Sequence, residues 1–388
     1  MAFFRDGEEQ MMQNPSLREA GRPAQKLITV GSVSKGVLAA RGGFAFDRAY
    51  FFDPEHRWEQ DKRIARFIEA SFPFPLYNLE ANLVQPDCLP IPFRQVGGLQ
   101  PNLILGAALN ADFVFFGDRD ADISHPPLRG LTDLDQLKGI KWEEREPIRT
   151  FLEQVRALKT RYRHDVDVFP PFFWDRSGRA TVHGLATTAH KLMGEEFYLR
   201  LHDDLGSAKR ILEWIAQTYV ALIRLFSERA EMPVTSIHIG ECSGCMVSTT
   251  HWAEAIIPAT NNLVDACGPV RLHSCGNSNR IVEQMAKVHN LGTLNVGTNT
   301  SVALCRQVVG EKIRLDLIPD PQMLCSGTPK DCRAWVERSL VETGNGPLEI
   351  RFHVDAAVPE PNVAAIFDTV AKHGCPPYNE SLVKRWGV

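Results

Sequence analysis

The sequence predicts an α/β protein built as a (β/α)8 TIM barrel with an N-terminal extension. Strand-like and helix-like segments alternate strictly over the C-terminal half of the chain, which is the order that produces a parallel sheet. The chain has 388 residues, a length at which such a barrel forms as one unit. A doubly wound open sheet is the structural alternative, but regular crossover helices over so long a chain favour a closed barrel.

Residues 1–90 differ in pattern from the rest and are expected to form the N-terminal extension. Two weakly patterned segments, 26–37 and 44–52, indicate a strand pair or an irregular cap. A helix is expected over 55–70, because its apolar residues recur at helical spacing. This extension is expected either to cap the barrel or to form the interface of a homodimer.

Residues 91–388 are assigned to the barrel. In the first half, strands are expected over 112–117 and 167–173 and helices over 148–162 and 205–229. The second half repeats strand and helix five times. The expected segments are, in order, 236–240, 251–266, 270–274, 278–288, 291–296, 301–309, 313–318, 329–342, 348–354 and 362–372.

Composition and charge exclude several classes of function. A net charge of −4 and a pI of about 6.3 give no basic surface for nucleic acid, so a small molecule or a protein is the expected partner. No stretch approaches the ~20 apolar residues of a membrane span, and the first residues are charged, unlike a secretory signal. We therefore expect a cytoplasmic protein. Several of its nine cysteines cluster late in the chain, and in a reducing cytosol clustered cysteines are more often ligands or nucleophiles than disulfides.

Polar and sulfur-containing residues follow the predicted strands at their carboxyl ends, where a (β/α)8 barrel carries its active site. They are Glu241, Cys242 and Cys245 after one strand, His273, Cys275 and Asn277 after the next, Cys325 further on, and His353 and Asp355 at the last strand. His273 and Cys275 lie two residues apart, so their side chains point to one face. Because zinc takes imidazole, thiolate and carboxylate ligands, His273, Cys275 and Glu241 are candidate zinc ligands and catalytic residues.

Simpler interpretations accompany this one. A His-x-Cys pair is common in proteins that bind no metal. Cys242 and Cys245 form a Cys-x-x-Cys pair with no second pair at zinc-finger distance; a redox dithiol between a strand and a helix is the alternative. The candidate substrate-binding residues are Arg94, Trp174, His183 and Asn277. An aromatic residue at such a position serves equally often in the core.

The segment 268–277, GPVRLHSCGN, resembles the GPxxLHxCGN strand of the uroporphyrinogen decarboxylase superfamily. Further similarities follow the family's order. They are PPLR at 126–129, GLATTA at 184–189, IPDP at 318–321 and PEPNV at 359–363. The resemblance covers roughly residues 90–375, and it points to the branch of corrinoid-dependent zinc methyltransferases.

This resemblance implies a zinc-dependent methyltransferase that moves a methyl group between a corrinoid and a small acceptor or donor. In that branch the His-x-Cys pair binds zinc, which implies zinc at His273 and Cys275, with Glu241 as a further ligand or a neighbour of the ligands. Methylcobalamin would be carried by a separate corrinoid protein, so the resemblance also implies that partner.

The chain departs from that branch at the third zinc ligand, which the family supplies as a cysteine near the last strand. Here residues 351–359 read RFHVDAAVP, so Cys325, His353 or Asp355 would have to replace it. Two other functions stay open. One is a metal-free decarboxylase of the tetrapyrrole type, although Gly98 stands where the family's RQAGR motif has its second arginine. The other is a non-catalytic corrinoid-binding barrel.

Overall fold

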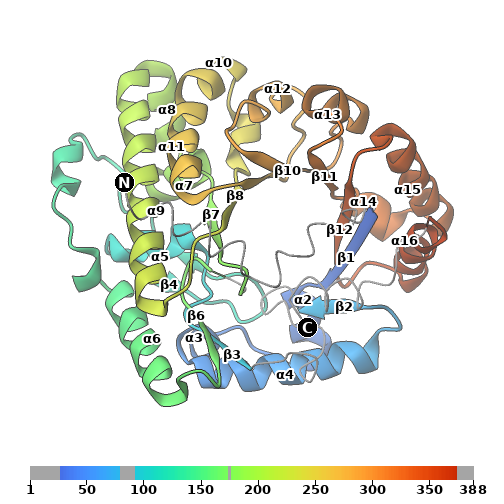
Figure 1. Ribbon diagram of the computed structural model, residues 1–388, viewed down its shortest axis with the longest axis horizontal. Coiled ribbons are helices and arrows are strands. Elements are labelled where there is room, and N and C mark those ends of the chain that lie inside the picture. Colours follow the sequence, from blue (N-terminus) through green and yellow to red (C-terminus); the bar gives the residue numbers. More distant parts are fainter. Residues whose placement is uncertain (1–26, 79–91, 174–175, 374–388) are drawn as a thin grey trace, which may run out of the picture.

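The computed structural model describes residues 27–78, 92–173 and 176–373. Its centre is a curled, entirely parallel sheet of eight strands in the order β2-β1-β12-β11-β10-β9-β8-β7, and helices surround this sheet on the outside (Figure 1). The predicted α/β class is therefore confirmed. β2 and β7 are the two edges of the sheet, and in the described part of the chain no ladder joins them, so closure of the barrel stays a prediction.

The strands agree closely with the sequence prediction in the C-terminal half. The sheet consists of β1 Leu27–Val33, β2 Leu76–Asn78, β7 Arg179–His183, β8 Ser236–Gly240, β9 Val270–Ser274, β10 Leu291–Val296, β11 Arg314–Leu317 and β12 Leu348–Val354. Two small sheets lie apart from it. They pair β3 Phe93–Gln95 with β6 Asp167–Phe169 and β4 Phe113–Val114 with β5 Asp122–Ile123.

The helices begin where the sequence supplies caps. A Thr328–Asp331 capping box starts α15, and the Asp53 side chain accepts from two backbone N–H groups at the start of α4. The helices are α2 Lys35–Gly42, α3 Arg48–Phe52, α4 Pro54–Ser71, α5 Pro101–Ala108, α6 Ile148–Tyr162, α7 Leu185–Met193, α8 Glu196–Asp203, α9 Leu205–Ala230, α10 Thr249–His251, α11 Ile257–Cys267, α12 Val282–Met285, α13 Val302–Val309, α14 Pro321–Ser326, α15 Pro329–Thr343 and α16 Glu360–Lys372. None of the helices in the described ranges is long and apolar enough to cross a membrane.

The N-terminal segment is not a separate cap where the structure describes it. β1 lies inside the main sheet between β12 and β2, with Leu27 paired to Leu348 and Val33 to Val354. The expected boundary at residue 90 therefore does not separate a cap from the sheet. The sequence pattern does not show this, because six of the seven β1 residues are buried. A strand that is covered on both faces has little alternation between apolar and polar residues. Residues 1–26 lie outside the described residues.

Alternation along the central strands sorts their side chains onto two faces. In β9, Val270 and Leu272 are buried, whereas Arg271 and His273 are partly exposed on the other face. Side chains of β8, β9, β10, β11 and β12 on this second face contact one another across the curled sheet. The interior of the sheet is thus polar, and it leads to the strand ends that carry the candidate site.

Candidate metal centre

Three residues that could hold a metal ion meet at the carboxyl ends of β8 and β9. One ligand atom from each of Cys242, His273 and Cys275 lies within 4.8 Å of the others. Across the three described ranges, this is the only such group of His, Cys, Asp and Glu side chains. The structure thus brings together the predicted pair, His273 and Cys275, and adds Cys242.

The parallel pairing of β8 with β9 explains why Cys242 belongs to this group. Gly240 is aligned with His273, and the N–H of the next residue, Glu241, donates to the His273 carbonyl at 2.7 Å. The chain therefore stays beside β9 for one residue past the end of β8. The following residue, Cys242, therefore lies next to Cys275.

A glycine allows the loop after β10 to approach the site closely. A Cβ atom added to Gly297 would lie 1.9 Å from the Cys275 carbonyl oxygen. Only a residue without a side chain fits this distance. The backbone that carries Cys275 is thus held against the next strand end.

The electrostatics of the group favour a thiolate at Cys275. The contact with the Cys242 thiol, and then the contact with His273, lower the pKa of Cys275 well below its ordinary value. The same contact with Cys275, followed by burial, raises the pKa of Cys242. A thiolate is the form of cysteine that ligates metals and acts as a nucleophile.

The expectation that Glu241 is a catalytic residue or a ligand of this group is not supported by its geometry. Its side chain is 1% exposed and turned towards the start of α7. One oxygen accepts from the Ala186 N–H at 3.0 Å, and the other accepts from the Thr187 N–H at 2.8 Å and the Thr187 hydroxyl at 2.7 Å. Burial raises the pKa of Glu241, while these hydrogen bonds oppose the rise. Glu241 thus caps a helix, because an N-terminus attracts a carboxylate.

The residues proposed for the missing third ligand lie elsewhere. Cys325 sits in α14, and Asp355 is exposed beyond β12. His353, on the interior face of β12, has its Nδ1 atom 2.5 Å from the Ser32 hydroxyl. The third member is instead Cys242, which we interpreted only as half of a Cys-x-x-Cys pair. One feature of the sequence could have indicated Cys242: it comes directly after β8, the strand that precedes the His273 strand in the chain and pairs with it.

The predicted substrate-binding residues differ in burial and in hydrogen bonding. His183 ends β7, its Nδ1 atom is buried without a hydrogen-bond partner, and burial lowers its pKa to about 4. Asn277 is exposed, and its side-chain oxygen accepts from the Asn279 N–H at 3.0 Å. Trp174 lies outside the described residues.

Arg94 has a different environment from the one expected of a substrate-binding arginine. Its Nε donates to Glu55 at 2.7 Å, and its guanidinium lies over the rings of Trp58 and Tyr162. It belongs to β3, in a small sheet apart from the main one. These contacts give Arg94 a structural role.

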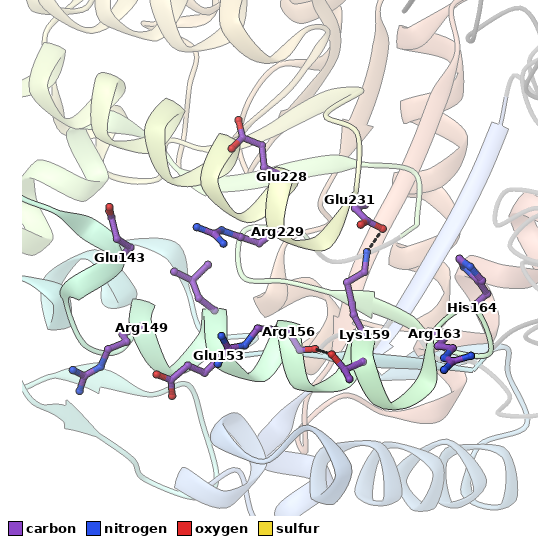
Figure 2. A pocket seen from close by; sticks show the side chains of 12 residues that line it. Glu143, Arg149, Glu153, Arg156, Lys159, Arg163, His164, Glu228, Arg229 and Glu231 are labelled. Atoms are coloured by element: carbon purple, nitrogen blue, oxygen red, sulfur yellow. Dashed lines mark hydrogen bonds and ion pairs between the residues drawn. The ribbon is translucent and has the colours of Figure 1, made fainter.

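A hollow with a charged lining lies away from this group. It measures about 700 Å³ and lies between α6 and the end of α9, where Arg149, Arg156 and Arg229 stand among several glutamates (Figure 2). Lys159 and Glu231, which form an ion pair there, are typical of its charged surface. It contains no cysteine. A smaller hollow of about 400 Å³ lies beside the ends of β10 and β11.

Comparison with known proteins adds three findings. No curated protein matches the chain. Among solved structures, a methyltransferase from Methanosarcina mazei superposes with a TM-score of 0.60 at 16% sequence identity, over 92% of this chain and 96% of that one. This likeness shows the fold. The family model of uroporphyrinogen decarboxylase (URO-D) matches residues 102–373, most of the chain and most of the predicted span. The chain therefore belongs to the uroporphyrinogen decarboxylase family.

Proposed function

We propose that this protein is a zinc-dependent methyltransferase that moves a methyl group between a corrinoid, carried by a separate protein, and a small acceptor or donor. The observation that carries the proposal is the meeting of two sulfurs and one imidazole at neighbouring strand ends. The fold shared with a methyltransferase at 16% identity supports it. The site lies at the carboxyl ends of β8 and β9, and (β/α)8 barrels carry their active sites at the carboxyl ends of their strands.

The residues fit a zinc ion chemically. Two sulfurs and one imidazole are a ligand set that zinc accepts, and three protein ligands leave a position open, as in catalytic sites. When bound, zinc would lower the pKa of a thiol acceptor or polarise a methyl donor or acceptor. Cys242, His273 and Cys275 would hold it, and Cys275 already favours its thiolate form.

Two further histidines face the interior near this group. Burial lowers the pKa of both His183 and His353 to about 4, so both imidazoles are neutral at pH 7. We infer that they orient the small substrate as hydrogen-bonding groups and add no positive charge beside the metal ligands. Ser32, which contacts His353 Nδ1, fixes the orientation of that ring.

The interior arginines make a metal-free decarboxylase the less favoured alternative. A polycarboxylate substrate requires arginines that can form bidentate contacts with it. Arg271 pairs with Asp316 at 2.5 Å, and Arg351 pairs with Glu349. Arg94, which lies in the separate β3–β6 sheet and not in this interior, pairs with Glu55 at 2.7 Å. These guanidinium groups are engaged with acids of the protein itself.

The test uses the purified full chain, its zinc content and the loss of methyl from methylcobalamin. We expect about one equivalent of zinc per chain and methyl transfer to at least one member of a panel of thiol, amine and folate acceptors. His273→Ala and Cys275→Ala should lose both properties. Full zinc retention in both variants would overturn the proposal. Turnover of uroporphyrinogen without metal would establish the decarboxylase, and methylcobalamin binding without methyl loss would indicate a non-catalytic barrel.

A further inference from the structure

A buried asparagine lies directly behind the candidate metal centre. Asn295 is 1% exposed, and β10 places it between β9 and β11. The strand register aligns it with His273 on one side and Asp316 on the other. Its side chain contacts both strands, and the Asn295 Oδ1 atom faces His273 Nδ1.

Two contacts fix which way the Asn295 amide points. Arg271 Nη2 donates to Asn295 Oδ1 at 2.9 Å, and Asn295 Nδ2 donates to the Asp316 carbonyl at 2.7 Å. A guanidinium can only donate, and a carbonyl can only accept. A flipped amide would lose both hydrogen bonds, so the oxygen must face Arg271.

The orientation of Asn295 in turn determines the tautomer of His273. An amide oxygen accepts and cannot donate, so the Nδ1 atom that faces it must carry the hydrogen. In a neutral imidazole the lone pair is then on Nε2. This leaves Nε2 as the atom that His273 can offer beside Cys242 and Cys275.

Arg271, the residue that fixes the Asn295 amide, is itself fixed by a buried acid. Its Nε donates to Asp316 at 3.1 Å, and the Asp316 side chain is fully buried. The interior of a (β/α)8 barrel is ordinarily filled by branched apolar side chains. A buried ion pair is no more stabilising than such packing. Its contribution here is geometric, because it fixes the one donor that orients Asn295.

We propose that Asn295, oriented by the Arg271–Asp316 pair, is a positioning residue that holds His273 in its Nδ1–H tautomer and so directs Nε2 to the metal. The part of this inference that concerns the metal rests on the proposed function. The tautomer itself does not, because every contact that fixes it is within the chain.

The experiment reads the tautomer directly in the metal-free protein. Imidazole nitrogens are observed by ¹⁵N NMR after labelling of histidine, and His273→Gln identifies the His273 signals. We expect the Nδ1–H tautomer in the wild type. Asn295→Leu removes the acceptor and should release His273 to a mixture of tautomers. Asn295→Asp keeps an acceptor and should preserve Nδ1–H.

Zinc affinity, measured by competition with a chelator, is the second readout. Asn295→Leu should weaken zinc binding by about 10- to 100-fold, the usual effect of removing the hydrogen-bond partner of a ligating histidine. Thr293→Val is the matched control, because Thr293 lies two residues before Asn295 in β10 and on the same face. This variant should change neither the His273 tautomer nor the zinc affinity.

The outcomes separate this inference from the proposed function. An Nε2–H tautomer in the wild type would overturn the positioning role, whatever the metal content and whether or not any variant folds. Unchanged tautomer and affinity in a folded Asn295→Leu variant would overturn it as well. If the tautomer responds as expected but the wild type binds no zinc, the positioning role stands and the proposed function fails.

Discussion

The ends of β8 and β9 carry the same kinds of residue as the ends of β11 and β12, but only the first region assembles them. At β8 and β9, ligand atoms of Cys242, His273 and Cys275 lie within 4.8 Å of one another. At β11 and β12, Cys325 lies in a helix and His353 contacts Ser32. In this protein, ligand-type residues at neighbouring strand ends come together where the backbone stays paired with the neighbouring strand beyond the strand end.

The exits from the strands explain the difference. After β8 the chain remains hydrogen-bonded to β9 at Glu241, so the next side chain falls beside the His-x-Cys pair. After β11 the chain enters α14 almost at once, because Asp320 caps that helix by accepting from the Gln322 N–H at 2.8 Å. Cys325 then falls within the helix.

The largest expected effect comes from exchanging one cysteine in each region for serine. Cys242→Ser should lose most of the bound zinc and the methyl transfer activity, because a hydroxyl is a much poorer zinc ligand than a thiolate. Cys325→Ser is the matched control and should keep both. Zinc retention in Cys242→Ser together with zinc loss in Cys325→Ser would reverse the comparison.

A smaller effect is expected for Glu241, the carboxylate within the first region. Glu241→Gln places an amide group where three donors now converge, so it should lower the free energy of unfolding by about 3 kcal/mol. Its zinc content should not change, since the carboxylate faces α7. Denaturant unfolding of the metal-free protein and metal analysis check this. Loss of zinc with unchanged stability would make Glu241 a ligand after all.

The smallest effect concerns His353 in the second region and depends on pH. Burial lowers its pKa to about 4 from 6.5, so between these values the unfolded chain binds more protons than the folded one. Stability therefore falls as the pH drops from 6.5 towards 4, and the loss from His353 should reach about 2 kcal/mol at pH 5.

His353→Asn removes this titrating group. The difference in unfolding free energy between pH 7 and pH 5, measured with denaturant on metal-free protein, should be about 2 kcal/mol smaller in the variant. An identical pH dependence in the two proteins would mean that His353 is accessible to protons in the folded state.

Much of the fold could be predicted from the sequence because the C-terminal strands and helices have strong, regular patterns. β8, β9, β10 and β12 begin and end where the sequence predicts. The place of β1 inside the main sheet could not be predicted, because a strand buried on both faces lacks alternation and its partner β12 lies more than 300 residues away in the sequence. Long-range pairing of this kind leaves no local signal.

The candidate site was predictable in part for the same reason. His273 and Cys275 share a strand, so their common face follows from spacing alone. Cys242 and Asn295 belong to neighbouring strands, and only the register brings them to His273. Glu241 and Arg94 have suitable chemistry for a site, but the structure uses their charges to cap a helix and to pair with Glu55.

X-ray absorption spectroscopy at the zinc K-edge tests the central claim most directly, because it counts sulfur and nitrogen neighbours of the metal in the native protein. The geometry predicts two sulfurs at about 2.3 Å and one imidazole nitrogen at about 2.0 Å, with a lighter atom in the remaining position. A single sulfur, or a shell of oxygen and nitrogen alone, would contradict a centre formed by Cys242, His273 and Cys275.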